Sequence, residues 1–71
     1  MTWDDLEPFD VVFPLSDSGP WVVTWKGRDE HGVTCLRSLD LYTGHHSEIE
    51  AGTSVFAPAV LVLRDGEDVN R

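Results

Sequence analysis

The side chains that could bind a metal ion are one cysteine, Cys35, and three histidines, of which His45 and His46 are adjacent. A structural zinc site takes about four ligands, usually in paired spacings such as Cys-x-x-Cys. The chain contains no such pair. Adjacent residues of a strand point to opposite faces, so His45 and His46 cannot readily share one ion. We therefore expect no metal site and no cofactor, but a solvated histidine pair and a core or half-buried cysteine.

Cys35 and the acidic residues are the groups that could support catalysis. A reactive cysteine needs a nearby base and partial exposure, and His31 has no evident third residue to orient it as that base. Two pairs of neighbouring carboxylates, at 4–5 and 67–68, lie near the ends of the chain, where a dry pocket that shifts a pKa is least expected. We therefore expect that the protein is not an enzyme. Replacing Cys35 by serine should cost stability without removing a chemical activity.

The charge balance limits the class of partner. Thirteen acidic residues face five lysines and arginines, which gives a formal net charge of -8. Binding to nucleic acid depends on basic side chains that neutralise phosphates, so direct binding to nucleic acid or to an anionic membrane is disfavoured. An acidic surface favours a basic protein partner, or it simply keeps a small protein soluble. The sequence leaves both interpretations open.

The length of 71 residues allows one small domain over residues 1–71, and we expect residues 1–5 and 65–71 to fray. A single cysteine excludes an internal disulfide, whereas small secreted domains usually carry several. The opening residues "MTWDDLEP" lack the apolar run of a signal peptide, and the apolar stretch "VFAPAVLVL" is far too short to span a membrane. These features predict a cytoplasmic protein.

The elements that must position these side chains are strands. Apolar residues alternate with a period of two in "FDVVFP" and "WVVTWK", and turn formers separate the segments at intervals of about ten residues. The segment "TWDDLEPF" is the exception and predicts a short helical turn capped by Thr2 and stopped by Pro8. The pattern predicts five strands, near 9–14, 21–27, 33–42, 45–50 and 59–64.

The hairpin between the second and third of these strands fixes which side chains face the core. Alternation predicts that Trp21 and Val23 point inward together with Val33 and Cys35. Arg37 has the same parity as the apolar residues of its strand, which predicts either a bulge near Arg37 and Ser38 or a bend in that strand. At the tip of the hairpin, the basic residues Lys26 and Arg28 are expected to lie beside the acidic residues Asp29 and Glu30.

Five short strands with a turn before the last predict an all-β fold, a small antiparallel SH3-like barrel whose closure removes exposed edges. The order "LEPFDVV", "GPWVVTW", "GVTCL", "APAVLVLR" resembles small SH3-like barrel proteins of actinobacteria and their phages, most of which have no known function. In these proteins a strand opens with Pro-Gly-Asp-Val, whereas here Phe9 replaces the glycine, so the first turn is expected to differ. The resemblance implies a phage-encoded accessory protein in the host cytoplasm.

The tryptophans carry the functional hypothesis, because two indoles in one strand are too large for so small an interior. A partly exposed tryptophan is a frequent hot spot of protein interfaces. We expect a non-enzymatic interaction module that binds a host or phage protein through an acidic, aromatic-containing face. The candidate partner-binding residues are Trp25, Asp29, Glu30, Asp40, Glu48 and Glu50.

Two alternatives stay open. A DNA mimic would place carboxylates at phosphate-like spacing on one face and block a nucleic-acid-binding site. A small structural subunit would use the last strand, where Val60 and Val62 alternate with Leu61 and Leu63, so that both faces are apolar. One face can enter the barrel, and the other needs cover from the N-terminal segment with Trp3 and Leu6, or from a second chain in a homodimer.

Overall fold

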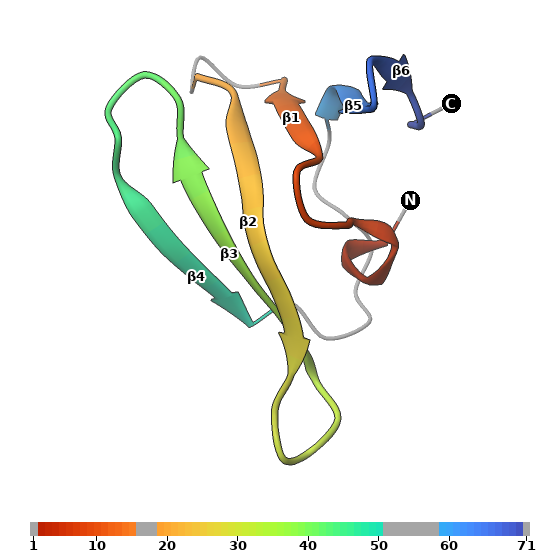
Figure 1. Cartoon of the computed structure of the whole chain (residues 1–71), viewed down its shortest axis with the longest axis vertical. Coiled ribbons are helices and arrows are strands. Elements are labelled where there is room, and N and C mark those ends of the chain that lie inside the picture. The colour runs from red at the N-terminus through yellow and green to blue at the C-terminus, as the bar shows by residue number, and fades with distance from the viewer. Residues whose placement is uncertain (1, 16–18, 51–58, 71) are drawn as a thin grey trace.

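The computed structural model describes residues 2–15, 19–50 and 59–70. It is an all-β antiparallel sheet preceded by one turn of 3₁₀ helix, as the sequence predicts (Figure 1). The strands lie side by side in the order β4-β3-β2-β1-β5-β6. The elements are η1 (Trp3–Asp5), β1 (Val11–Pro14), β2 (Trp21–Arg28), β3 (Thr34–Asp40), β4 (His46–Glu50), β5 (Ala59–Arg64) and β6 (Glu67–Asp68).

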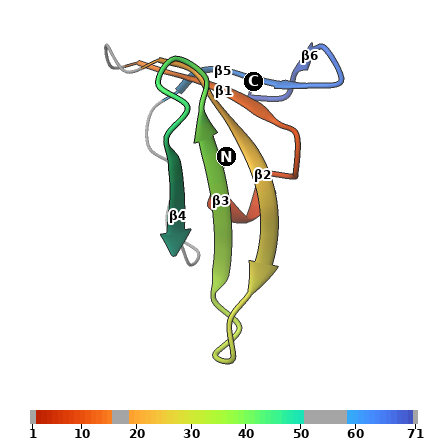
Figure 2. The same ribbon diagram turned by 60° about the vertical axis from the view of Figure 1, so that its left-hand side comes forward.

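The prediction of a closed five-stranded barrel is wrong, because the sheet is open and has six described strands. The extra strand, β6, forms because Asp65 and Gly66 both have positive φ, 52° and 83°, which turns the chain back along β5. The sheet nevertheless bends strongly along β2 and β3. Figure 2 shows β1, β5 and β6 crossing above the long strands β2 to β4.

The third strand is shorter than predicted because Asp40 ends it. One carboxylate oxygen of Asp40 accepts the backbone N–H groups of Tyr42 and Thr43, at 2.8 and 2.9 Å. A side chain that binds the backbone two and three residues ahead stabilises a turn. β3 therefore stops at Asp40 and leaves 41 and 42 in the connection to β4.

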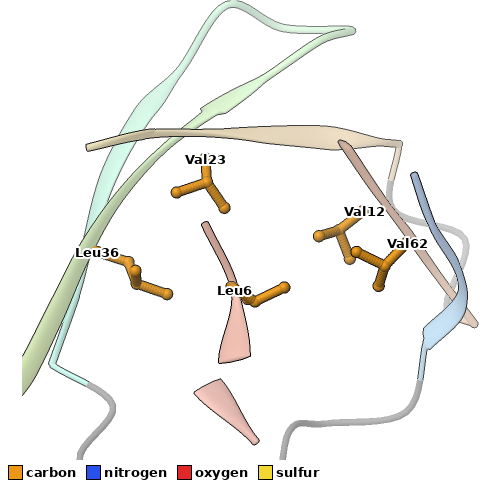
Figure 3. Packing of buried hydrophobic residues seen from close by; sticks show 5 residues of the cluster. All are labelled: Leu6, Val12, Val23, Leu36 and Val62. Carbon is orange, nitrogen blue, oxygen red and sulfur yellow. The ribbon is translucent and has the colours of Figure 1, made fainter. Parts of the chain in front are cut away.

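Five fully buried side chains form the core on the inner side of the bend: Leu6, Val12, Val23, Leu36 and Val62 (Figure 3). Four of them come from neighbouring strands, and Leu6 comes from the segment after η1. Burying a side chain of this size contributes roughly 1.5–3 kcal/mol, so Leu6 fastens the N-terminal segment to the sheet. The half-buried Trp21 packs against this core, and the placement of Trp21 and Val23 is as predicted.

The inward-facing residues of β3 are not Val33 and Cys35, so that prediction is wrong. The buried residues of β3 are Thr34, Leu36 and Ser38. The reason is a register shift in β2, where Val23 lies opposite Ser38 and Trp25 lies opposite Arg37. Thr24 is the extra residue, so the bulge predicted near Arg37 and Ser38 lies in the partner strand.

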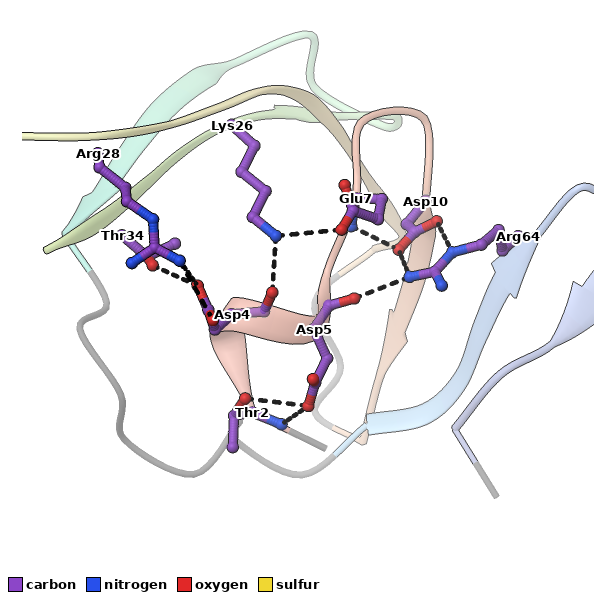
Figure 4. A network of polar contacts seen from close by, with 9 residues as sticks. All are labelled: Thr2, Asp4, Asp5, Glu7, Asp10, Lys26, Arg28, Thr34 and Arg64. Carbon is purple, nitrogen blue, oxygen red and sulfur yellow. Dashed lines mark hydrogen bonds and ion pairs between the residues drawn. The ribbon is translucent and has the colours of Figure 1, made fainter. Parts of the chain in front are cut away.

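The basic residues after this bulge bind the N-terminal segment, not Asp29 and Glu30 at the hairpin tip. Lys26 Nζ donates to Asp4 O at 2.6 Å and lies 3.2 Å from Glu7 Oε1. Arg28 pairs with the Asp4 carboxylate at 3.2 Å (Figure 4). The bulge turns both side chains toward the inner side, where η1 supplies carboxylate and carbonyl oxygens.

Residues near both ends of the described chain, where we expected fraying, form hydrogen bonds. Asp5 accepts hydrogen bonds from the backbone and hydroxyl of Thr2, at 2.7 and 2.9 Å. Near the other end, the Val69 N–H donates to Val62 O at 2.9 Å, and the Asn70 side chain donates to Ala59 O at 3.3 Å. Fraying of 1–5 and 65–71 stays a prediction.

Asp10 and Arg64 form the most buried ion pair of the described residues. Arg64 donates from Nε and Nη2 to the two oxygens of Asp10, at 3.0 and 2.8 Å, and from Nη2 to Asp5 O at 2.8 Å. The Asp10 carboxylate is 1% exposed and also accepts the Glu7 N–H at 2.8 Å. The hydrogen bonds that Arg64 donates to Asp10 raise the pKa of Arg64, so its guanidinium stays charged.

Phe9 has a φ of 74°, in the left-handed region that glycine favours. Because Phe9 replaces the glycine of the similar proteins, we expected the first turn to differ from theirs, yet Phe9 adopts a conformation typical of glycine. The Asp10 N–H donates to Glu7 O at 3.1 Å, which closes a turn with Pro8 and Phe9 at its centre. Phe9 and Asp10 together lie opposite Val23. The Phe9 N–H donates a hydrogen bond to Val23 O, and the Val23 N–H donates one to Asp10 O. Phe9 therefore occupies the first position of a glycine-type bulge.

We expect Phe9→Gly to unfold at higher denaturant concentration than Phe9→Ala, with a difference of about 1 kcal/mol in the free energy of unfolding. Both variants remove a ring that is 82% exposed, and only glycine removes the left-handed strain. Urea titrations followed by circular dichroism measure the difference. Equal stability of the two variants would show that the backbone at this position is not strained.

We expect Arg64→Met to lower the free energy of unfolding by about 3 kcal/mol, because it leaves the Asp10 carboxylate buried without its cation. Arg28→Met is the matched control. It removes an ion pair whose side chains are largely exposed, so its effect on unfolding should be much smaller. Chemical denaturation of both variants gives the comparison, and similar losses would contradict a special role for Arg64.

Candidate functional site

A row of polar and aromatic side chains crosses the outer side of the sheet, away from the core. Trp25 of β2, Arg37 of β3 and Glu48 of β4 lie opposite one another in the strand register. The bulge at Thr24 places Trp25 on this side, although Trp21 and Val23 of the same strand face inward. We call these three residues the Trp25 row.

The Trp25 ring is held in place while 41% of the residue stays exposed. The Arg37 guanidinium carbon lies 4.9 Å from the centroid of the ring, a cation–π contact. The ring also covers Gly27, where a Cβ atom would come within 2.3 Å of it. These two neighbours therefore restrict the movement of the ring.

An apolar row runs beside the Trp25 row on the same side of the sheet. Arg37 and Leu39 are two residues apart on β3, so both point outward. Leu39 lies opposite Val22, which lies opposite Val11, which lies opposite Leu63. All members of the apolar row are half-buried: Leu39, Val22, Val11 and Leu63, with Phe13 and Leu61 in the next pair along β1 and β5. Together the two rows define the outer face.

The N-terminal segment does not cover the outer face. Leu6 belongs to the core, and Trp3 packs against that core from the inner side. The apolar side chains Leu61 and Leu63 of the last long strand therefore stay half-buried on the opposite side. In β3 the outward residues are Cys35, Arg37 and Leu39. The alternation in the sequence grouped these residues correctly but assigned them to the core. The charge of Arg37 was the sign that this group faces outward.

The structure brings together only some of the residues that we expected to bind a partner. Trp25 and Glu48 share the Trp25 row. Asp29 and Glu30 lie at the tip of the β2–β3 hairpin, and Asp40 lies at the far end of β3. The side chain of Glu50 lies outside the described residues, although its backbone pairs with Cys35.

Two of these carboxylates shape turns. Asp29 accepts the N–H groups of His31 and Val33, at 2.8 and 2.9 Å. The hydrogen bonds from the N–H groups of Thr43 and Tyr42 lower the pKa of Asp40, so this carboxylate is ionised at neutral pH. Glu30 has a different environment, because it is exposed and its carboxylate lies 3.4 Å from His31 Nε2.

Most of the positive charge is paired with the N-terminal segment. Lys26, Arg28 and Arg64 form ion pairs with Glu7, Asp4 and Asp10. Arg37 stacks on Trp25, and Arg71 lies outside the described residues. Within the described parts of the chain, ion pairs to lysine or arginine are confined to these three acids, so the remaining surface stays negative.

The described residues that we considered as metal ligands or catalytic groups do not gather into one site. In the described ranges, no group of three or more histidine, cysteine and acidic side chains could hold a metal ion. Cys35 is half-buried, and its sulfur lies 3.6 Å from Val33 O. No helix among the described residues has the length and apolar character needed to cross a bilayer.

We expect Gly27→Ala to lower the free energy of unfolding by about 1 kcal/mol, because the added methyl group displaces the Trp25 ring. In a Trp25→Ala background the same change should cost nothing, since the obstructing ring is gone. A double-mutant cycle with chemical denaturation measures this coupling. An equal cost in both backgrounds would mean that the ring does not lie over Gly27.

Comparisons with protein-family models, with curated proteins and with solved structures found no match to this chain. The resemblance to small barrel proteins of actinobacteria and their phages therefore stays a prediction from the residues that suggested it.

Proposed function

We propose that this protein is a non-enzymatic interaction module whose outer face binds a protein with a basic rim. The observation that carries the proposal is Trp25, which is 41% exposed although its ring contacts both Arg37 and Gly27. Tryptophan and arginine are, with tyrosine, the residue types enriched at interface hot spots. A ring fixed in advance loses little conformational freedom on binding, so more of its contact energy appears as affinity.

The apolar row supports the same proposal. A hot spot is usually surrounded by contacts that exclude water from it. Leu39 and Val22 lie immediately beside the Trp25 row, and Val11 and Leu63 continue the apolar surface across β1 and β5. A partner that covers Trp25 would therefore also bury this surface.

Charge supports a basic partner. The chain has a formal net charge of -8, and three of its five basic residues are paired with the N-terminal acids. A negative surface speeds the encounter with a positive one, and this effect weakens with salt. Glu48 lies opposite Arg37 at the edge of the outer face, so it supplies a negative charge where the proposed partner has its basic rim.

We further propose that the fold is an open variant of an SH3-like barrel. For its origin, we propose a phage-encoded accessory protein that acts in the host cytoplasm. The strand order supports the first part, because β1 to β4 follow one another and β5 returns beside β1. The bend of β2 gives the sheet a concave side that holds the core (Figure 3). The origin rests on the sequence resemblance alone.

The alternatives receive less support. A DNA mimic needs carboxylates gathered on one face, whereas Asp29 and Glu30 lie at one end of β3 and Asp40 at the other. A structural subunit or homodimer would use the same apolar row, but two copies of so acidic a chain repel each other. Both alternatives predict distinct outcomes in the experiment below.

Trp25→Ala should weaken partner binding by about 2 kcal/mol and change the melting temperature little. The partner is captured from host lysate, identified by mass spectrometry, purified, and titrated calorimetrically with each variant. Tyr42→Ala is the matched control, because Tyr42 is another exposed aromatic residue but lies in the β3–β4 connection. Its binding should equal that of the unaltered protein.

Unchanged binding of a folded Trp25→Ala protein would overturn the proposal. Capture of a nucleic-acid-binding protein whose DNA competes with this chain would favour the mimic. Light scattering that shows a dimer, disrupted by a charge introduced at Val22, would favour the structural subunit.

A further inference from the structure

A pocket of about 420 Å³ lies on the inner side of the sheet, at the end of β3 that leads into the β3–β4 connection. This volume falls within the range of small-molecule sites, roughly 300–1,000 Å³. Its described lining combines two indoles, two apolar residues and four polar ones: Trp3, Trp21, Pro14, Ile49, Ser38, Asp40, His45 and Ser47. The pocket is distinct from the outer face, because Trp21 and Ser38 point to the opposite side from Trp25 and Arg37.

The aromatic wall is built by residues far apart in the sequence. Trp3 belongs to η1 and Trp21 begins β2, and their rings stack with centroids 6.3 Å apart and planes inclined by 22°. The attachment of the N-terminal segment to the sheet brings the two rings together. The faces of indole rings carry negative electrostatic potential, and cations bind there more strongly than at any other aromatic side chain.

The carboxylate in the pocket belongs to Asp40. One of its oxygens accepts the N–H groups of Tyr42 and Thr43, which fixes the carboxylate at the wall. These hydrogen bonds lower its pKa and keep it charged at neutral pH. No lysine or arginine is among the described lining residues, and the net charge of -8 adds to the negative potential. An anionic ligand is therefore opposed by charge.

We propose that the Trp3–Trp21 pocket binds an alkylated ammonium group, either a quaternary ammonium compound or the side chain of a methylated lysine. The two indoles would contact the methyl groups and the positive charge, Ile49 and Pro14 would contact the remaining carbon atoms, and Asp40 would provide a counter-charge. A neutral molecule of the same shape gains the apolar contacts alone. Discrimination between the two is the property that defines this site.

The test is a titration of uniformly ¹⁵N-labelled protein, followed through the indole N–H signals of its three tryptophans. The probe is choline, and the comparison is 3,3-dimethylbutan-1-ol, in which a carbon atom replaces the charged nitrogen. All titrations use one buffer at about pH 8. Choline should shift the Trp3 and Trp21 signals saturably and leave Trp25 unchanged, and the neutral analogue should bind about tenfold more weakly.

Asp40→Asn tests the counter-charge. An asparagine oxygen can still accept the N–H groups of Tyr42 and Thr43, so the turn should persist. We expect choline to bind this variant about tenfold more weakly. Glu67→Gln removes the same charge from the exposed strand β6 and should leave the affinity unchanged. Equal losses in both variants would mean that choline responds only to overall charge and would overturn the site.

Further arms separate the sources of the ligand. Tighter binding of N-acetyl-trimethyllysine amide than of choline would identify a modified protein side chain, and the reverse order would identify a free quaternary ammonium compound. Either result supports the shared chemistry. Equal affinity for choline and its neutral analogue, a stronger response to glucose than to choline, or parallel shifts of all three indole signals would each refute the proposal.

Discussion

The buried ion pair between Asp10 and Arg64 is the interaction on which the arrangement of the chain depends. It joins the start of β1 to the end of β5, and the Arg64 guanidinium also holds the carbonyl of Asp5. A buried pair of this kind adds little net stability, but removal of one partner leaves an uncompensated charge. The pair therefore selects one arrangement of the N-terminal segment, in which Leu6 enters the core, over others that a short chain could adopt.

Placing the N-terminal segment on the concave side divides the molecule into two unlike sides. The inner side gains Leu6 and Trp3, and with them the core and the pocket beside Trp21. The convex side receives no cover from the described chain, so its apolar row stays half-buried beside Trp25. The same hydrogen bonds that complete the core thus determine which face the described chain leaves uncovered.

The alternation of apolar residues predicted the strands well, because each strand has one face against a single core. It could not predict the side on which Trp25 lies, since the bulge at Thr24 reverses the alternation within β2 and is visible only in the pairing with β3. The strand β6 was missed for another reason. The dipeptide Asp65–Gly66 is a hairpin signal, but the expectation that residues 65–71 fray left no place for a strand after it. The pocket depends on Trp3 meeting Trp21, a long-range contact that sequence periodicity does not contain.

The open sheet has a consequence for how this protein stays separate from its own copies. Among the described strands, β4 and β6 each have one neighbour, so each presents unpaired backbone groups that could template a strand of another molecule. β6 is only two residues long, and both are acidic, while β4 carries Glu48. Short length and like charge at sheet edges discourage edge-to-edge aggregation. The acidic residues of these two edge strands can thus be understood as protection of a sheet whose described strands do not close on themselves.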